Sequence, residues 1–254
     1  MLLKATTPQL VIFDLDGTLL DTLDDLSAAV NYAMSQRSFP QHTREEYRMM
    51  VGHGARNLMS RALPPERAHD EAMIEAALAD FKAYYNTHID VFTKPFPGIP
   101  ELISELHQKG IKLAVASNKF QEGTEHLIKE FFPDISFVAI LGNRLGHPLK
   151  PSPEVVGEIL HIAGLQKEKS PLSPGRGVGG EVVMVGDSDT DMETAANGGI
   201  RGIAVNWGYR NMRDWANKLL ASQPFDVPQE PQSREPRCLA VVDTIEELQK
   251  ILLP

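Results

Sequence analysis

The chain has 254 residues, 42% of them apolar, with 34 acidic and 25 basic side chains and a formal net charge of −9. This acidic balance, without any run of basic residues, argues against a nucleic-acid partner and against binding to an anionic membrane. The single cysteine, Cys238, permits no internal disulfide, and no apolar stretch resembles a signal peptide or approaches the roughly 20 residues of a membrane span, so we expect a cytoplasmic protein.

The first predicted element is a strand at residues 10–13, whose apolar run ends abruptly at Asp14. A long segment follows, from about residue 22 to 93, in which no strand pattern is evident. Helical signals in it are the apolar spacing of 23–34, a capping-box pattern at 43–46 and an apolar face along 68–86. We therefore expect an all-helical module, residues 18–95, inserted after the first strand.

Beyond residue 97, short apolar runs alternate with helical patterns. Strands are predicted at 112–116, 137–141, 182–185, 202–205 and 239–242, and helices at 100–110 and 153–164. This alternation predicts an α/β core, residues 1–17 and 96–254, with a doubly wound, mostly parallel sheet. Surface loops are expected at the Pro- and Gly-rich stretches 170–180 and 224–236.

Polar side chains follow several of these strands. Ligands of an open α/β sheet bind outside the carboxyl ends of the strands, so we expect these residues to meet in one crevice. Its expected lining is Asp14, Asp16, Ser117, Asp187 and Asp191, with Lys150 nearby. Clustered carboxylates repel one another unless a cation compensates them, and ligands that are all oxygen favour a hard ion such as Mg²⁺.

Four motifs carry a resemblance to a known family. The run Asp14-Leu15-Asp16-Gly17-Thr18-Leu19 resembles the first motif of the haloacid dehalogenase (HAD) superfamily. Ser117 resembles the second motif of this superfamily, and Lys150-Pro151-Ser152-Pro153 resembles the third. The fourth motif is resembled by Gly186-Asp187-Ser188-Asp189-Thr190-Asp191. The resemblance covers nearly the whole chain. It implies a HAD-like Rossmannoid core, a helical cap placed directly after the first motif, and a small phosphorylated metabolite as substrate.

The resemblance also implies catalytic roles. Asp14 would be the nucleophile that forms an aspartyl-phosphate, and Asp16 would be the general acid for the leaving alcohol and then the base for water. Mg²⁺ would be held by Asp14, by the backbone carbonyl of Asp16 and by Asp187, with Asp191 in support.

Other residues of the motifs would bind the substrate. Ser117 and Lys150 would hold the phosphoryl oxygens, and Lys150 would supply positive charge as negative charge develops. Thr18 and Asn118, which adjoin the first and second motifs, are further expected substrate-binding residues.

The helical module is expected to select the substrate. Residues 51–63 resemble the cap segment of bacterial phosphoglycolate phosphatases, which implies cleavage of 2-phosphoglycolate to glycolate and phosphate. The carboxylate of such a substrate calls for a cationic contact, for which Arg56 and Arg61 are the candidates. The alternative is that each arginine lies on a solvated helix face.

Other functions stay open within the same superfamily. A β-phosphoglucomutase, or a phosphatase acting on sugar phosphates or pyrophosphate, shares the core motifs. A phosphonoacetaldehyde hydrolase would need a cap lysine, and residues 49–63 contain none. A non-catalytic binding module is the remaining alternative, against which the intact set of Asp14, Asp16, Lys150 and Asp187 argues.

Overall fold

The computed structural model describes residues 7–165, 181–221 and 238–254. The two expected surface loops, 170–180 and 224–236, lie outside these described residues. Among the described residues, no helix is long and apolar enough to cross a membrane.

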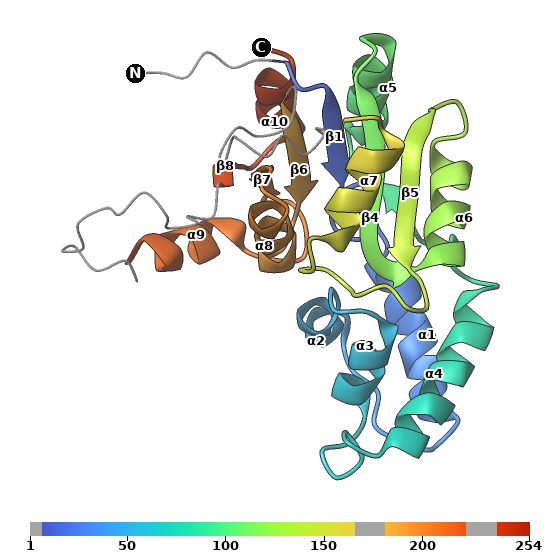
Figure 1. Ribbon diagram of the computed structural model, residues 1–254. Coiled ribbons are helices and arrows are strands. Elements are labelled where there is room, and N and C mark those ends of the chain that lie inside the picture. The colour runs from blue at the N-terminus through green and yellow to red at the C-terminus, as the bar shows by residue number, and fades with distance from the viewer. Residues whose placement is uncertain (1–6, 166–180, 222–237) are drawn as a thin grey trace.

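The centre of the molecule is a six-stranded parallel sheet (Figure 1). Its strands are β1 (Leu10–Phe13), β4 (Lys112–Phe120), β5 (Phe137–Asn143), β6 (Val182–Gly186), β7 (Arg201–Val205) and β8 (Cys238–Val242). Their spatial order is β5-β4-β1-β6-β7-β8, with every neighbouring pair parallel. The order reverses between β4 and β6 on either side of β1, which is where doubly wound sheets bind ligands. The predicted fold class is therefore confirmed.

Helices cover both faces of the sheet. The core helices are α5 (Ile99–Gln108), α6 (Gln121–Phe131), α7 (Glu154–Ile162), α8 (Asp189–Asn197), α9 (Met212–Ala221) and α10 (Ile245–Leu252). Val11 and Phe13 of β1 pack into the apolar cluster that includes α5, α6 and α10. Leu10 and Ile12, which point to the opposite face, pack into the cluster that includes α7 and α8. Both faces are thus buried, which explains why the sequence of β1 is apolar at every position.

One strand is longer than expected. The sequence predicts a strand at 112–116, which would end before the polar residues Ser117 and Asn118, whereas β4 continues to Phe120 with an irregular register after Ala116. A polar run normally ends a buried strand, but the side chains of Ser117, Asn118 and Lys119 are themselves buried at the carboxyl end of the sheet, so the strand continues.

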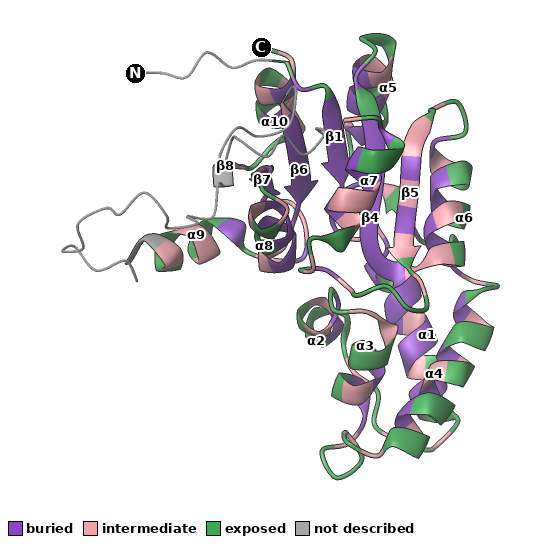
Figure 2. Ribbon diagram, viewed as in Figure 1, coloured by how far each residue is buried: buried purple, intermediate pink, exposed green. Residues whose placement is uncertain are grey.

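The segment after β1 is helical, as expected. It contains α1 (Leu23–Ser35), α2 (Arg44–Met50), α3 (Ala55–Ala62) and α4 (Glu71–Tyr85), which pack against one another. The capping box that was predicted at 43–46 is present, with Thr43 and Glu46 each bonded to the backbone of the other. Figure 2 shows the buried residues of α1 and α4 on the sides that face each other.

Two short strands connect this helical module to the sheet. Strand β2 (Leu20–Asp21) enters the module and β3 (Lys94–Pro95) leaves it, and the two pair antiparallel. The buried carboxylate of Asp25 accepts hydrogen bonds from the backbone N–H groups of Phe92 and Thr93, which fixes the return segment to α1. As Figure 1 shows, the module lies beyond the carboxyl ends of the strands.

Candidate functional site

A cavity of about 60 Å³ is lined by residues from the carboxyl ends of the central strands and from the helical module. Its lining from the core includes Asp14, Asp16, Ser117, Asn118, Lys119, Lys150, Asp187, Tyr209 and Arg210. Its lining from the module includes Leu26, Val51, Leu58, Phe81 and Tyr85. One end of the cavity is therefore charged and the other is mostly apolar.

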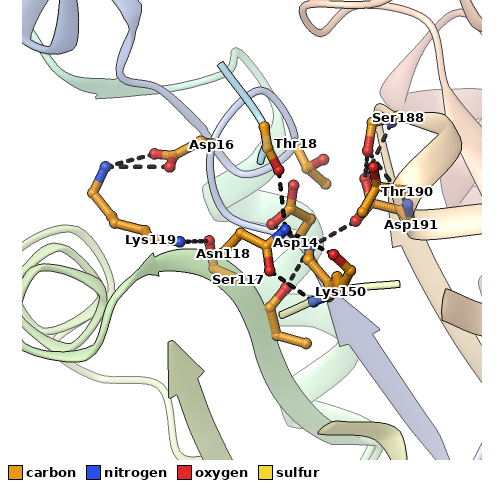
Figure 3. Close-up of polar contacts among 12 residues, drawn as sticks. Asp14, Asp16, Thr18, Ser117, Asn118, Lys119, Lys150, Ser188, Thr190 and Asp191 are labelled. Carbon is orange, nitrogen blue, oxygen red and sulfur yellow. Dashed lines mark hydrogen bonds and ion pairs between the residues drawn. The ribbon is translucent and has the colours of Figure 1, made fainter. Parts of the chain in front are cut away.

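Lys150 joins two acidic side chains at the charged end of the cavity. Its Nζ lies 2.8 Å from Oδ1 of Asp14 and 2.7 Å from Oδ1 of Asp191, and it also donates to the Ala116 carbonyl at 2.8 Å (Figure 3). All three side chains are nearly or fully buried. Buried charges need such pairing, because each loses its hydration. The arrangement fixes Asp14 directly after β1, where its N–H donates to the Val185 carbonyl of β6.

The carboxylates outnumber the positive charge that faces them. Asp14, Asp187 and Asp191 each offer an oxygen, and these three atoms lie within 4.8 Å of one another. Burial, reinforced by the charge of Asp191, raises the pKa of Asp14 to about 7 although Lys150 acts in the opposite direction. Burial and the charges of Asp14 and Asp191 also raise the pKa of Asp187 well above its ordinary value. Three carboxylates with one ammonium leave an excess of two negative charges, which a divalent cation with oxygen ligands would neutralise.

Local backbone features place Asp187 in this cluster. Its Oδ2 accepts a hydrogen bond from the Tyr209 N–H at 2.6 Å, and its Oδ1 accepts one from the Thr18 hydroxyl at 3.4 Å. Gly17 has a φ of +86°, and a Cβ at Gly17 or at Gly208 would collide with Asp187. The two glycines thus allow two loops to close tightly around this carboxylate.

Asp191 belongs both to the cluster and to the start of α8. Its Oδ2 accepts hydrogen bonds from the N–H and the hydroxyl of Ser188, at 3.1 and 2.6 Å, in a reciprocal capping box. Its other oxygen accepts from Lys150. Because both oxygens already have donors, Asp191 supports the cluster by holding Lys150 and the turn after β6.

Asp16 lies apart from the three clustered carboxylates. Its Oδ1 accepts hydrogen bonds from the Thr22 hydroxyl at 2.7 Å and from Lys119 Nζ at 2.9 Å, and Figure 3 shows it directed toward Lys119. The side chain lines the same cavity as Asp14. A second carboxylate therefore reaches the cavity without belonging to the candidate metal cluster, which suits a group that exchanges a proton.

The second motif lies on the extended part of β4. Ser117 lines the cavity, and its hydroxyl accepts a hydrogen bond from the N–H of Lys119 at 3.2 Å. The Asn118 side chain also lines the cavity, but it donates to the carbonyls of Gly52 and Lys150 and accepts from the Lys150 N–H. Asn118 thus connects three segments around the cavity, and its amide already has protein partners.

The structure does not bring Arg56 or Arg61 to the cavity, and it places each of them on an exposed helix face, which was the alternative for both. Arg56 forms ion pairs with Glu71 and Glu75 on α4, and Arg61 donates to the carbonyls of Met49 and Met50. Both arginines are exposed, and neither belongs to the cavity lining. The reason is the orientation of α3, which turns Leu58, Met59 and Ala62 inward and its arginines away.

The placement of Thr18 also differs from the expectation. Thr18 is fully buried, donates to Asp187 and is absent from the cavity lining. It therefore supports a carboxylate instead of facing the space in which a substrate would bind.

The sequence predicted no role for several residues that line the cavity, among them Tyr85, Lys119, Tyr209 and Arg210. Lys119 was signalled by its place in the run Ser117-Asn118-Lys119, whereas Arg210 lies in a loop without periodic pattern. The structure thus supplies the cavity with a cation from β4 and another from the loop after β7, in place of the arginines of α3.

Comparisons with known proteins show which family the chain resembles. The sequence is 32% identical over 221 residues to the phosphoglycolate phosphatase of Mesorhizobium japonicum, covering 86% of this chain and 92% of that one. It is 35% identical over 224 residues to the enzyme of the same name from Caulobacter vibrioides, covering 86% and 88%. A solved structure of a candidate phosphoglycolate phosphatase from Lactobacillus delbrueckii subsp. bulgaricus superposes with a TM-score of 0.78, at 31% identity, over 98% of this chain and 99% of that one. Since its residues 11–205 also match the family as a whole, the chain belongs to the haloacid dehalogenase-like hydrolases.

Proposed function

We propose that the chain is a Mg²⁺-dependent phosphatase that cleaves 2-phosphoglycolate to glycolate and phosphate through an aspartyl-phosphate. The observation that supports this most strongly is the buried group of Asp14, Lys150 and Asp187, which opens into the same cavity as Asp16. The substrate is proposed from the names of the relatives, which are about one-third identical over most of their length.

The first half of the proposed reaction forms the covalent intermediate. A carboxylate oxygen of Asp14 attacks phosphorus, and the bond from phosphorus to the leaving oxygen breaks. Asp16 gives a proton to that oxygen, so that glycolate departs as a neutral alcohol at this position. Lys150, which is held between Asp14 and Asp191, faces the phosphoryl oxygens together with Ser117.

The second half returns the enzyme to its starting state. Asp16, now ionised, takes a proton from water, and the oxygen of that water attacks phosphorus. The bond from phosphorus to Asp14 breaks, phosphate leaves and the Asp14 carboxylate is regenerated. A bound Mg²⁺ would offset negative charge on the phosphoryl group, and its proposed ligands are Asp14, the Asp16 carbonyl and Asp187, with Asp191 in support.

The proposal assigns separate roles to two domains. Residues 1–17 and 96–254 form the catalytic core, and residues 18–95 form a cap that opens to admit substrate and closes to exclude water. The pairing of β2 with β3 supports this division, because both connections between the parts lie side by side there.

A substrate panel with a free-phosphate readout tests the proposal. The panel contains 2-phosphoglycolate, sugar phosphates, pyrophosphate and p-nitrophenyl phosphate, each with Mg²⁺. We expect the highest kcat/KM for 2-phosphoglycolate. A higher value for a sugar phosphate or pyrophosphate would overturn the substrate assignment and leave the phosphatase assignment in place.

The nucleophile is tested separately with Asp14→Asn, which keeps the size of the side chain but removes its charge. We expect turnover to fall by roughly a thousandfold or more. Asp24→Asn, at an exposed residue paired with Arg44, is the matched control and should keep turnover within about twofold. Retention of more than a few per cent of activity in Asp14→Asn would contradict the mechanism.

A further inference from the structure

Apart from Lys150, which the proposed function assigns to the phosphoryl oxygens, one cation of the described cavity lining has polar contacts that leave it able to bind an anion. Of the described residues that line the cavity, Lys119, Lys150 and Arg210 are cationic. Lys150 contacts two carboxylates and a carbonyl, and Arg210 donates to the backbone carbonyls of residues 48, 49 and 51. Both hydrogen bonds of the Lys119 ammonium, at 2.9 and 3.2 Å, are with the single carboxylate of Asp16. An ammonium has three N–H groups, so Lys119 retains donor capacity in the cavity.

The ring beside this ammonium carries a hydroxyl without a partner among the described residues. Tyr85 of α4 is fully buried and lines the cavity, and its hydroxyl has no hydrogen-bond partner among the described residues. Lys119 Nζ lies 4.8 Å from the centre of the Tyr85 ring, within the range of a cation–π contact. A buried hydroxyl without a partner costs stability, which indicates a place where a ligand would supply the acceptor.

The surroundings fix the tyrosine and limit the size of the ligand. The Tyr85 ring stacks on Phe81 at 5.2 Å and meets the edge of Phe120 at 6.1 Å. Leu26 and Leu58 complete an apolar wall on the cap side of the cavity. Burial raises the pKa of Tyr85 well above its ordinary value, so that the hydroxyl is a neutral donor at physiological pH. An ammonium and a hydroxyl donor within an apolar wall suit a small anionic group.

We propose that Lys119 and Tyr85 form the subsite that binds the carboxylate of the leaving group, with Lys119 as its cationic contact and Tyr85 as its hydrogen-bond donor. This inference rests on the proposed function and names the residues that select the substrate. Lys119 belongs to the core and Tyr85 to the cap, so the subsite is complete only when the two parts are together. Recognition of the carboxylate and closure of the cap are thereby coupled.

The test compares two esters of similar size in wild type, Tyr85→Phe and Lys119→Met. 2-Phosphoglycolate carries the carboxylate, whereas 2-hydroxyethyl phosphate carries a neutral hydroxymethyl group in its place. Lys119 also contacts Asp16, so its loss lowers kcat/KM for both esters, and the informative quantity is the ratio between them. We expect this ratio to fall about fivefold in Tyr85→Phe and about ten- to a hundredfold in Lys119→Met. Tyr85→Phe preserves the packing of the ring, which guards against a loss of folding.

Tyr209→Phe is the matched control, because this cavity-lining hydroxyl already bonds to Thr22 and should leave the ratio unchanged. A ratio that stays constant in Tyr85→Phe and Lys119→Met, or that falls equally in Tyr209→Phe, would overturn the subsite.

Calorimetry tests the subsite without turnover. It measures the binding of both esters to Asp14→Asn and to the double variant that also carries Lys119→Met. If the wild type hydrolyses neither ester, the proposed function is overturned. The subsite is then still tested by the calorimetric binding of the two esters. The subsite requires that Lys119→Met weaken binding of 2-phosphoglycolate at least tenfold more than that of 2-hydroxyethyl phosphate.

Discussion

The guanidinium of Arg210 lies 2.8 Å from the carbonyl oxygen of Val51, and it also donates to the carbonyls of Arg48 and Met49. Arg210 follows β7 in the core, whereas the three carbonyls belong to the end of α2. The last carbonyls of a helix lack partners within it, and a cation is favoured there by the helix dipole. This contact therefore holds α2 against the core at the edge of the cavity.

Loss of this contact should weaken the packing of the helical module, residues 18–95, against the core. We expect Arg210→Ala to lower kcat/KM for 2-phosphoglycolate about three- to tenfold, mainly through a higher KM, since charged hydrogen bonds of a partly exposed group are lost. Amide hydrogen exchange of residues 44–51 should become faster. Steady-state kinetics and exchange mass spectrometry measure the two effects.

Arg61→Ala is the control for this prediction. Arg61 donates to the carbonyls of Met49 and Met50, of which Arg210 also contacts the first, but Arg61 lies within the helical module itself. We expect less than a twofold change in kcat/KM. Equal effects of the two substitutions would show that Arg210 has no special role between cap and core.

Much of the fold could be predicted because buried parallel strands have a simple sequence pattern. Residues 10–13 are apolar at each position because both faces of β1 are covered. The end of β4 was missed because Ser117 to Lys119 are polar, and a polar run normally ends a buried strand. Here their partners come from distant segments, such as Gly52 and Asp16, which local sequence cannot reveal.

In the site, too, residues placed by the order of the strands could be predicted, whereas residues placed by contacts between distant segments could not. Asp14 and Asp187 directly follow β1 and β6, so the topology alone brings them together. The arginines of residues 51–63 could not be oriented in this way, because the direction of a helical side chain depends on which face is buried. Arg210 lies in an aperiodic loop, and its contacts with α2 depend on how the cap is placed.

The ion pairs of Arg56 give a direct prediction. We expect Arg56→Ala to change the ratio of kcat/KM between 2-phosphoglycolate and 2-hydroxyethyl phosphate by less than twofold, because Glu71 and Glu75 hold its side chain outside the cavity lining. The measurement is the same pair of assays used for Lys119. A tenfold fall in the ratio would restore Arg56 as a carboxylate ligand and would count against Lys119 and Tyr85.

The excess of negative charge at Asp14, Asp187 and Asp191 predicts a strict metal requirement. Activity should disappear in excess EDTA and return when Mg²⁺ is added. Ca²⁺ should inhibit, since it is larger and takes more ligands than Mg²⁺, which disturbs the approach of Asp14 to phosphorus. Phosphate release in metal-exchanged buffers measures both effects. Full activity in EDTA would refute the requirement.

The raised pKa of Asp14 predicts how the stability of the metal-free protein depends on pH. The folded state raises this pKa from its ordinary value of 3.8 to about 7, so protonation of Asp14 favours the folded state. The resulting stabilisation is complete below the unfolded pKa and is lost as the pH rises through about 7. In EDTA, the free energy of unfolding should therefore fall by about 1 kcal/mol between pH 6 and pH 8 because of this group.

Asp14→Asn provides the control, because asparagine does not titrate and the variant should show a smaller fall over the same pH range. Urea denaturation at the two pH values measures both proteins. Added Mg²⁺ should restore the stability of the wild type at pH 8, where the ionised carboxylates bind it, and should do so less at pH 6, where a proton competes for Asp14. If the wild type and Asp14→Asn lose equal stability between pH 6 and pH 8, the buried carboxyl of Asp14 does not titrate in this range. The repulsion inferred among Asp14, Asp187 and Asp191 is then compensated within the protein.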